Sequence, residues 1–322
     1  RPPEGGTVKK SFALIGFAML AVLIGLVPAA SVGAASRPSS YTLPGNAVFP
    51  EGVAYQPTTG NFFVSSTTDG SVLRGNVMEP TAAPFIAGGD IQFSAIGVKV
   101  DNAGRLIVAG GVTGEVRVYD SATGTPIRTF TTGTGGFLND IAVAKNGDLF
   151  VTDSFRPVLW RIPAAEIEPG APEAAEAWLD LTGTIPYVTG QFNVNGIVST
   201  ENGRHLVVSQ SFTSELFRID VATKAVTEVD LGGDAVAGDG LALLGRILYA
   251  GEPFLHQVAK VSLSGDLSTG TVLSRTTDPS FLTPTTLAVA AGRLLVVNSQ
   301  FERLFGGLPP ILPFTISSIP LP

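Results

Sequence analysis

The chain has 322 residues, of which 44% are hydrophobic and only 15% are charged, so it can bury a large core and is too apolar to be disordered. It contains no cysteine, which excludes disulfides and thiolate metal sites. Its 38 glycines and 23 prolines indicate many short strands joined by tight turns.

The first 35 residues have the pattern of an export signal. Lys9 and Lys10 precede the apolar stretch SFALIGFAMLAVLIGLV, and the small residues PAASVGAAS follow it. This order is typical of a signal peptide, here with cleavage after Ala35. The alternative is an uncleaved membrane anchor, because 17 apolar residues are at the lower limit for a membrane span. In both cases we expect residues 36–322 to form the folded domain, secreted or otherwise extracytoplasmic.

Residues 36–322 form an acidic domain. Residues 1–35 hold three of the 20 basic and one of the 27 acidic residues, so the remainder carries a net charge of −9. No basic run remains, which argues against a nucleic-acid partner. We expect a monomer that contacts a membrane only through an uncleaved N-terminal segment. Calcium is plentiful outside cells, so an acidic exported domain is compatible with an oxygen-ligated calcium ion.

One phrase recurs six times along the chain. Its copies are 45, 43, 56, 44 and 46 residues apart and begin at Glu51, Ile96, Asn139, Asn195, Asp239 and Thr285. Each copy has two alternating apolar runs around a tight turn, such as Asn-Ala-Gly at 102–104, which supplies the positive φ of a β-hairpin. A third apolar run follows in most copies, for example GEVRVYD and SELFRID. The repeat predicts an all-β fold, a six-bladed β-propeller of four-stranded antiparallel blades around a central channel.

Two segments concern the joins between blades. The long interval of 56 residues contains Ala164–Ala177, which we expect to form a short helix or an extended loop between blades three and four. SYTLP at residues 40–44 and PFTISSIPLP at the C-terminus could complete one blade from the two ends of the chain. Such closure removes the exposed sheet edges that invite aggregation.

The first residues of the six copies, called the ring residues below, are expected to surround one mouth of the channel. Four of them carry side-chain oxygens: Glu51, Asn139, Asn195 and Asp239. Each could be a turn former. Together they place two carboxylates across a narrow axis, where a divalent cation would relieve their repulsion. Calcium suits four oxygen ligands, whereas zinc is disfavoured because no ring position carries Cys or His.

At these positions the chain resembles the senescence-marker/gluconolactonase-like (SGL) lactonases and the related diisopropyl fluorophosphatase-type calcium hydrolases. The resemblance rests on PEG at 50–52, LND at 138–140, NG at 195–196 and DG at 239–240. It implies that Glu51, Asn139, Asn195 and Asp239 hold a catalytic calcium ion. It also implies hydrolysis of lactone, ester or organophosphate bonds, with Asp239 as general base or nucleophile.

A second register predicts the wall of this site. The loop after the second strand returns to the same mouth, and in blades three to six it carries Phe155, Phe212, Phe254 and Phe301. These rings could pack between blades or form an apolar rim that favours a hydrophobic ester or lactone over a sugar lactone. Arg156 and His256 lie in the same loops and are further candidates for substrate contact. His256 also leaves open an elimination reaction of the kind that streptogramin lyases catalyse.

Two functions from different classes remain open. The first is an exported calcium-dependent hydrolase of a small-molecule lactone or ester. The second is a non-catalytic extracytoplasmic propeller that binds a partner and uses calcium structurally. Four protein ligands would leave coordination positions open to a substrate, which favours the enzyme.

Overall fold

The computed structural model describes residue 1, residues 5–11 and residues 37–322. The chain divides into the units Arg1–Ala35 and Ser36–Pro322, and the second unit contains the strands and helices given below. Most of the predicted signal peptide, including the cleavage point after Ala35, lies outside the described residues. Within the described part, no helix is long and apolar enough to cross a membrane.

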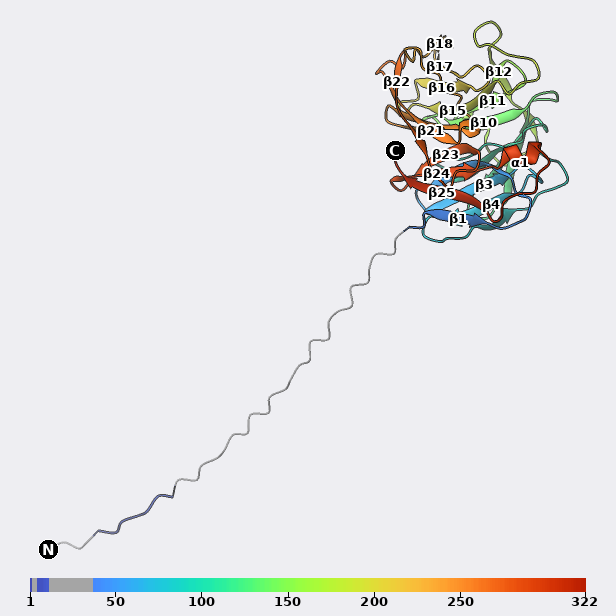
Figure 1. The fold of residues 1–322 in the computed structure, drawn as a ribbon. Helices are drawn as coiled ribbons and strands as arrows, with labels where there is room; N and C mark the ends of the chain where they lie inside the picture. Colours follow the sequence, from blue (N-terminus) through green and yellow to red (C-terminus); the bar gives the residue numbers. More distant parts are fainter. Residues whose placement is uncertain (2–4, 12–36) are drawn as a thin grey trace. The chain divides into compact units, whose positions relative to one another are not determined.

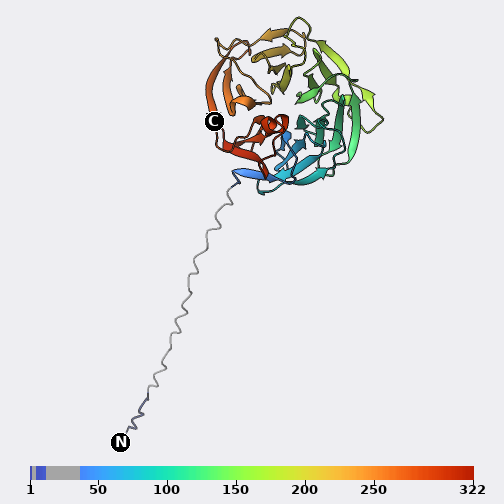
Figure 2. The ribbon, with the colours of Figure 1, turned by 45° about the vertical axis from the view of Figure 1, so that its right-hand side comes forward.

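Six sheets, each built on four antiparallel strands, surround a central channel, which confirms the six-bladed β-propeller (Figures 1 and 2). Blades one to three comprise β2 (Pro50–Gln56), β3 (Asn61–Ser66), β4 (Val72–Asn76) and β5 (Ala83–Ile86); β6 (Val98–Val100), β7 (Arg105–Ala109), β8 (Glu115–Asp120) and β9 (Pro126–Thr131); and β10 (Leu138–Val143), β11 (Leu149–Asp153), β12 (Val158–Ile162) and β14 (Glu176–Asp180). Blades four to six comprise β15 (Val194–Ser199), β16 (His205–Gln210), β17 (Glu215–Asp220) and β18 (Val226–Glu228); β19 (Leu241–Leu244), β20 (Ile247–Glu252), β21 (Gln257–Leu263) and β22 (Gly270–Thr277); and β23 (Pro284–Ala290), β24 (Arg293–Asn298), β25 (Phe314–Pro320) and β1 (Ser40–Leu43).

The alternating apolar runs become the packing between blades. Strand residues such as Phe62, Ile107 and Val208 are completely buried. The turn between the first and second strand contains a glycine at positive φ in every blade, as the hairpin motif predicted: Gly60, Gly104, Gly147, Gly203, Gly245 and Gly292.

The two ends of the chain close the propeller together. β1 pairs with β25 in antiparallel register, with Leu43 opposite Phe314, so the N-terminal strand is the outermost strand of blade six. Figure 2 shows this blue strand beside the red C-terminal strand. Tyr41 on β1 also packs against Phe62 of blade one, with ring centroids 4.9 Å apart. The predicted closure is confirmed.

The expected place of Ala164–Ala177 was wrong. This segment contains a short 3₁₀ turn (Ala164–Glu166), the strand β13 (Glu173–Ala174) and the start of β14, so it lies inside blade three, before its outer strand. β13 pairs in parallel with β9 of blade two. Arg128 of β9 holds the segment there, because its guanidinium donates to the carbonyls of Glu166 and Ala171 and pairs with Glu173.

The ring residues lock neighbouring blades together through their backbones. Each of the six ring carbonyls accepts a hydrogen bond from the preceding blade. The donors are Thr285 to Glu51, Ser65 to Ile96, Gly97 to Asn139, Thr152 to Asn195, Ser209 to Asp239 and Gly240 to Thr285. The first strands are therefore held at one height around the channel.

A glycine follows the ring residue in four blades because the next blade lies too close for a side chain. A Cβ atom on Gly52 would lie 2.4 Å from the Ile96 carbonyl oxygen, and one on Gly196 would lie 2.2 Å from that of Asp239. Gly97 and Gly240 meet the next blade in the same way. None of the four has a positive φ, so these glycines are required by the close approach of the next blade and not by a left-handed backbone.

We expect Gly196→Ala to destabilise the protein by about 1–3 kcal/mol or more, because the added methyl group must push blades four and five apart. The matched control is Gly89→Ala, where a Cβ would meet nothing within 4 Å. The midpoint of urea unfolding measures the effect. Equal midpoints for the two variants would contradict the close approach of the blades.

Candidate functional site

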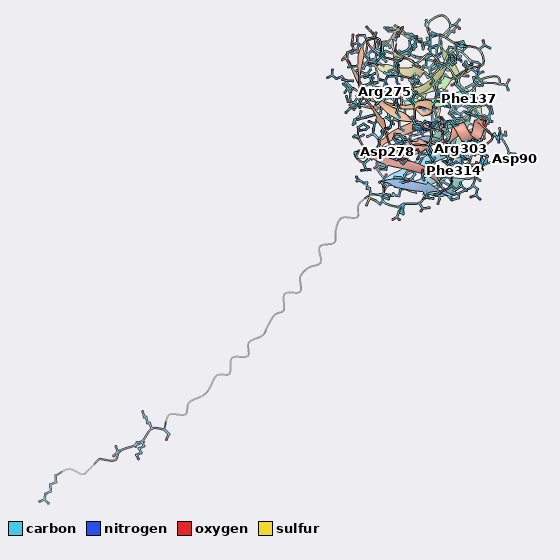
Figure 3. The ribbon with its side chains drawn as sticks, viewed as in Figure 1. Asp90, Phe137, Arg275, Asp278, Arg303 and Phe314 are labelled. Atoms are coloured by element: carbon cyan, nitrogen blue, oxygen red, sulfur yellow. The ribbon has the colours of Figure 1, made fainter. Side chains whose placement is uncertain are left out.

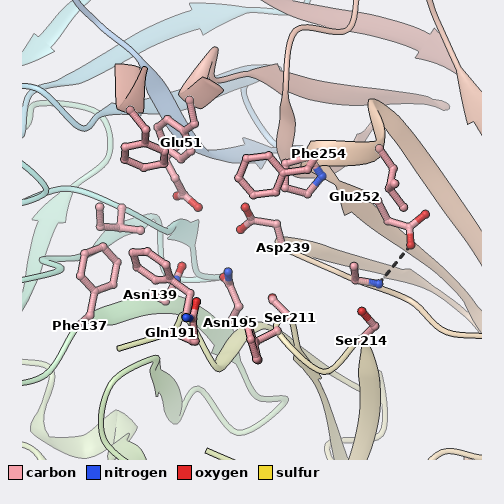
Figure 4. Close-up of a pocket in the computed structure, with 18 of the residues that line it drawn as sticks. Glu51, Phe137, Asn139, Gln191, Asn195, Ser211, Ser214, Asp239, Glu252 and Phe254 are labelled. Atoms are coloured by element: carbon pink, nitrogen blue, oxygen red, sulfur yellow. Dashed lines mark hydrogen bonds between the residues drawn. The ribbon is translucent and has the colours of Figure 1, made fainter. Parts of the chain in front are cut away.

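A cavity of about 500 Å³ opens where the first strands begin. Its floor contains all four oxygen-bearing ring residues that the sequence predicted, Glu51, Asn139, Asn195 and Asp239. Figure 4 shows the carboxylates of Glu51 and Asp239 pointing toward each other across the cavity, with the two amides beside them. Ile96 also lines the cavity, whereas Thr285 does not.

Local irregularities in the strands aim these side chains. The pairing register shifts between Pro50 and Val53 in β2, and the first strands of blades three and four shift at the equivalent position. Glu51, Asn139 and Asn195 therefore lie in bulges, which re-aim side chains that a regular strand would alternate between its faces. Asp239 precedes β19 and is fixed by its N–H, which donates to the Gly251 carbonyl at 2.8 Å.

Three side-chain oxygens on the floor are buried without a hydrogen-bond partner: Glu51 Oε2, Asn139 Oδ1 and Asn195 Oδ1. The Asn139 amide is held by Nδ2, which donates to Ser154 Oγ at 3.0 Å, so its unpartnered oxygen is fixed in place. The other Glu51 oxygen accepts a hydrogen bond from Thr286 at 3.4 Å. Buried polar atoms without a partner are rare and call for a ligand.

Burial and neighbouring carboxylates raise the proton affinity of both Glu51 and Asp239. Burial raises the pKa of Glu51 well above its ordinary value, and the charges of Asp239 and Asp140 raise it further. Burial also raises the pKa of Asp239 to about 7, against a side-chain hydrogen bond with Asn195 that lowers it. Asp140 is paired with Lys99 at 2.7 Å, so this lysine is already engaged below the floor. Both carboxylates can be ionised together only at a cost that a cation would remove.

This set of donors fits a calcium ion. It comprises two carboxylates and two amides, all oxygen donors, and no His or Cys among the described residues lines the cavity. Among those residues, no three Asp, Glu, His or Cys side chains gather as a metal site would require, so a metal here would depend on the two amides. Hard oxygen ligands of this kind suit calcium rather than zinc.

Phenylalanines form most of the wall. Seven of them, called the aromatic wall below, line the cavity: Phe93, Phe137, Phe192, Phe212, Phe254, Phe301 and Phe305. The sequence predicted three of these, from the loops after the second strands. It also contained a signal for three others, because Phe93, Phe137 and Phe192 lie two or three residues before a ring residue. These three residues lie in the loops that lead into the first strands of blades two, three and four.

Phe155 and Arg156 are not among the residues that line the cavity. Phe155 packs behind the aromatic wall, with its ring centroid 5.3 Å from that of Phe137. The Arg156 guanidinium donates to the buried Asp153 carboxylate at 2.7 Å and to the Thr132 carbonyl at 2.9 Å. Because Asp153 also accepts the N–H of Phe137, this pair holds the loop that carries the wall.

His256 does not line the cavity either. Its Nε2 lies 3.0 Å from a carboxylate oxygen of Glu302, and its Nδ1 accepts a hydrogen bond from the Thr283 N–H at 3.4 Å. Its neighbour Phe254 lines the cavity instead. His256 therefore connects the loops of blades five and six.

Phe93 has a strained backbone. Its φ of 54° is in the left-handed region, which costs an L-residue about 1–2 kcal/mol. Its N–H donates to the Thr67 carbonyl at 2.6 Å, and its carbonyl accepts the Val112 N–H at 3.2 Å. This conformation stacks the Phe93 ring on Phe305, with centroids 6.3 Å apart. Strain of this kind clusters at functional sites.

No protein-family model and no curated protein matches the sequence. Several solved structures match the fold. The major allergen Mala s 1 of Malassezia sympodialis has a TM-score of 0.65 at 14% identity, over 88% of this chain and 96% of its own. A gluconolactonase from Xanthomonas campestris has a TM-score of 0.63 at 17% identity, over 88% and 89%.

Virginiamycin B lyase from Staphylococcus aureus also matches, with a TM-score of 0.57 at 11% identity, over 88% of this chain and 98% of its own. At such low identities, the TM-scores show only a shared propeller fold. This supports the fold part of the resemblance to the gluconolactonase-like lactonases. Proteins of several functions share the fold, so it does not decide what the chain does.

In metal-free buffer we expect the protein to lose stability as the pH rises from about 5 to about 8. The raised pKa values of Glu51 and Asp239 mean that the folded protein holds protons that the unfolded chain has released, so this stabilisation is lost as the pH passes about 7. The pKa of His205 is lowered, mainly by burial, and acts in the opposite direction.

Comparison with Asp239→Asn isolates the effect of the carboxylate pair. The melting temperature of the wild-type chain should fall more steeply with pH than that of the variant. Parallel curves would show that the two carboxylates do not share a buried site.

Proposed function

We propose that the protein is an exported, calcium-dependent hydrolase of lactone or ester bonds, with organophosphate esters as a further substrate class. One observation carries the proposal: the unpartnered oxygens of Glu51, Asn139 and Asn195 lie with the Asp239 carboxylate on the floor of one cavity. These four side chains would hold the cation. The gluconolactonase among the structures of similar fold is consistent with this activity.

Bound calcium would polarise the carbonyl or phosphoryl oxygen of the substrate and offset the charge that develops there. Asp239 is the residue proposed to react. Next to a cation its carboxylate is held in the ionised form, which both a nucleophile and a general base require. Asn195 lies beside this carboxylate on the cavity floor, and the Thr286 hydroxyl donates to Glu51 in its role as a ligand.

The shape of the site favours this function over a structural calcium ion. A structural ion would be surrounded by protein ligands, whereas the ring residues of blades two and six, Ile96 and Thr285, offer no side-chain ligand to the cavity. Positions therefore remain for water and substrate. An elimination reaction that uses His256 is disfavoured, because this imidazole is bound to Glu302 and does not line the cavity.

Calcium should raise the melting temperature of the protein, because it relieves the repulsion between two buried carboxylates. At 100 times its dissociation constant, a ligand specific to the folded state adds about 2.7 kcal/mol of stability. Glu51→Gln should remove most of this gain. Glu79→Gln, at an exposed position outside the cavity, is the control and should keep it. A calcium response that Glu51→Gln leaves unchanged would place the ion elsewhere.

Hydrolysis of a panel that contains a sugar lactone, an alkyl lactone, an aryl ester and an organophosphate tests the activity. We expect turnover that requires calcium. It should fall by at least about 10²–10⁴-fold in Asp239→Asn, which is the usual contribution of a general base. The control is Asp90→Asn, an exposed aspartate at the periphery of the propeller (Figure 3). Calcium binding without any turnover would instead make this a metal-stabilised binding propeller.

A further inference from the structure

The wall of the cavity restricts the substrates that this site accepts. We infer that the substrate is uncharged and carries a hydrophobic alkyl or aryl group, as in an alkyl-substituted lactone or an aryl ester, and that polyhydroxylated sugar lactones and anionic esters are poor substrates. This inference rests on the proposed function and concerns the same site. It separates the protein from the gluconolactonase whose fold it shares.

One side of the wall is a continuous arc of phenylalanine rings. Phe192 and Phe137 have centroids 5.0 Å apart, Phe137 and Phe93 6.4 Å, Phe93 and Phe305 6.3 Å, and Phe305 and Phe301 5.3 Å. The rings come from loops of different blades and support one another. The arc is therefore already formed before a ligand binds, and it offers a contiguous apolar surface.

The other side of the wall is apolar and exposed. Phe212, Phe254 and Leu255 are 50%, 65% and 56% exposed, respectively, although each lines the cavity. Exposed apolar side chains gathered at one mouth mark a surface that a ligand covers. A hydrophobic group that extends from the floor along this side would remove their surface from water.

The wall offers a sugar few hydrogen-bonding side chains besides Gln191 and Ser214. Ser211 already donates its hydroxyl to the Gly238 carbonyl. Glu252 already accepts from the Ala237 N–H at 3.1 Å, the bond drawn in Figure 4, and from Gln257 at 2.7 Å. Most hydroxyl groups of a sugar lactone would lose water against phenylalanine rings and find too few new partners, which opposes binding.

The wall offers an anionic substrate no charged partner, and the proposed calcium ion would serve to offset Glu51 and Asp239 on the floor. Its acidic residues are Glu51, Asp239 and Glu252, and no Arg, Lys or His of the described residues lines it. Cations around the cavity are engaged: Arg156 pairs with Asp153, Lys99 with Asp140 and Arg275 with Glu252. A substrate carboxylate or phosphate monoester would therefore find no partner on the wall.

A homologous series of γ-lactones with alkyl chains of increasing length tests the inference, with D-glucono-δ-lactone and a carboxylate-bearing lactone as comparisons at saturating calcium. We expect kcat/KM to rise about fourfold for each methylene group that the wall buries. The sugar lactone and the anionic lactone should be the poorest substrates. Equal or faster hydrolysis of the sugar lactone, or a rate independent of chain length, would overturn the inference.

A matched pair of leucine variants assigns the effect to the wall. Leu255 lines the cavity and is 56% exposed, whereas Leu273 is 52% exposed on β22, outside the cavity. Leu255→Ala should reduce the gain with chain length, and Leu273→Ala should leave it unchanged. Both side chains are exposed, so neither variant is expected to impair folding. An equal response of the two variants would contradict the assignment.

Calorimetric binding of the corresponding alkyl lactams, whose amide resists hydrolysis, separates this inference from the proposed function. Lactam affinity that grows with chain length, without turnover of any lactone, would support the apolar ligand class and reject the hydrolase. Turnover of the sugar lactone with no affinity for the long-chain lactams would support the hydrolase and reject the apolar ligand class.

Discussion

The structure depends on a circle of hydrogen bonds at the start of the six first strands. Each ring carbonyl accepts a donor from the preceding blade, and Thr285 of blade six completes the circle at Glu51. Glycines such as Gly52 and Gly196 allow the backbones to approach this closely. The same residues therefore close the fold and bring their side chains to one level, so that two carboxylates and two amides converge.

Bringing these side chains together destabilises the folded state, and packing in the rest of the propeller must offset this. The pKa values of Glu51 and Asp239 are raised because the fold buries both carboxylates, and Asp140 adds a third negative charge whose partner is Lys99. Phe93 adds backbone strain at the wall. A propeller built only for stability has no use for these features. They are consistent with a site that is completed by a cation and a substrate.

The sequence predicted those parts of the site that follow the repeat. Glu51, Asn139, Asn195 and Asp239 occupy one register in different blades, so the blade spacing alone placed them on one floor. The repeat could not predict where the side chains of Arg156 and His256 point. Their loops bring them near the mouth, but Arg156 forms an ion pair with Asp153 and His256 a hydrogen bond with Glu302, so neither side chain lines the cavity.

Other parts were missed because they depart from the repeat. β13 adds a strand to blade two from inside the long irregular stretch of blade three, a pairing that Arg128 supports. At two other junctions the outer strands are joined only by single parallel bridges, Thr42 to Thr81 and Asp230 to Thr269. Three of the seven rings of the aromatic wall come from the loops that enter the blades, whose spacing to the ring residue varies between two and three residues. Phe305 belongs to the short α-helix α1 (Phe301–Phe305), where blade five has only a 3₁₀ turn (Pro253–Leu255) in the equivalent loop.

The most direct measurement of the central claim is a calorimetric calcium titration at pH 7 in two buffers of different ionisation enthalpy, which counts the protons released. If calcium binds between Glu51 and Asp239, about one proton should leave for each ion bound, because a cation displaces the proton that the raised pKa values hold on the pair. Absence of binding, or binding with no proton release, would contradict a calcium site on the floor of the cavity.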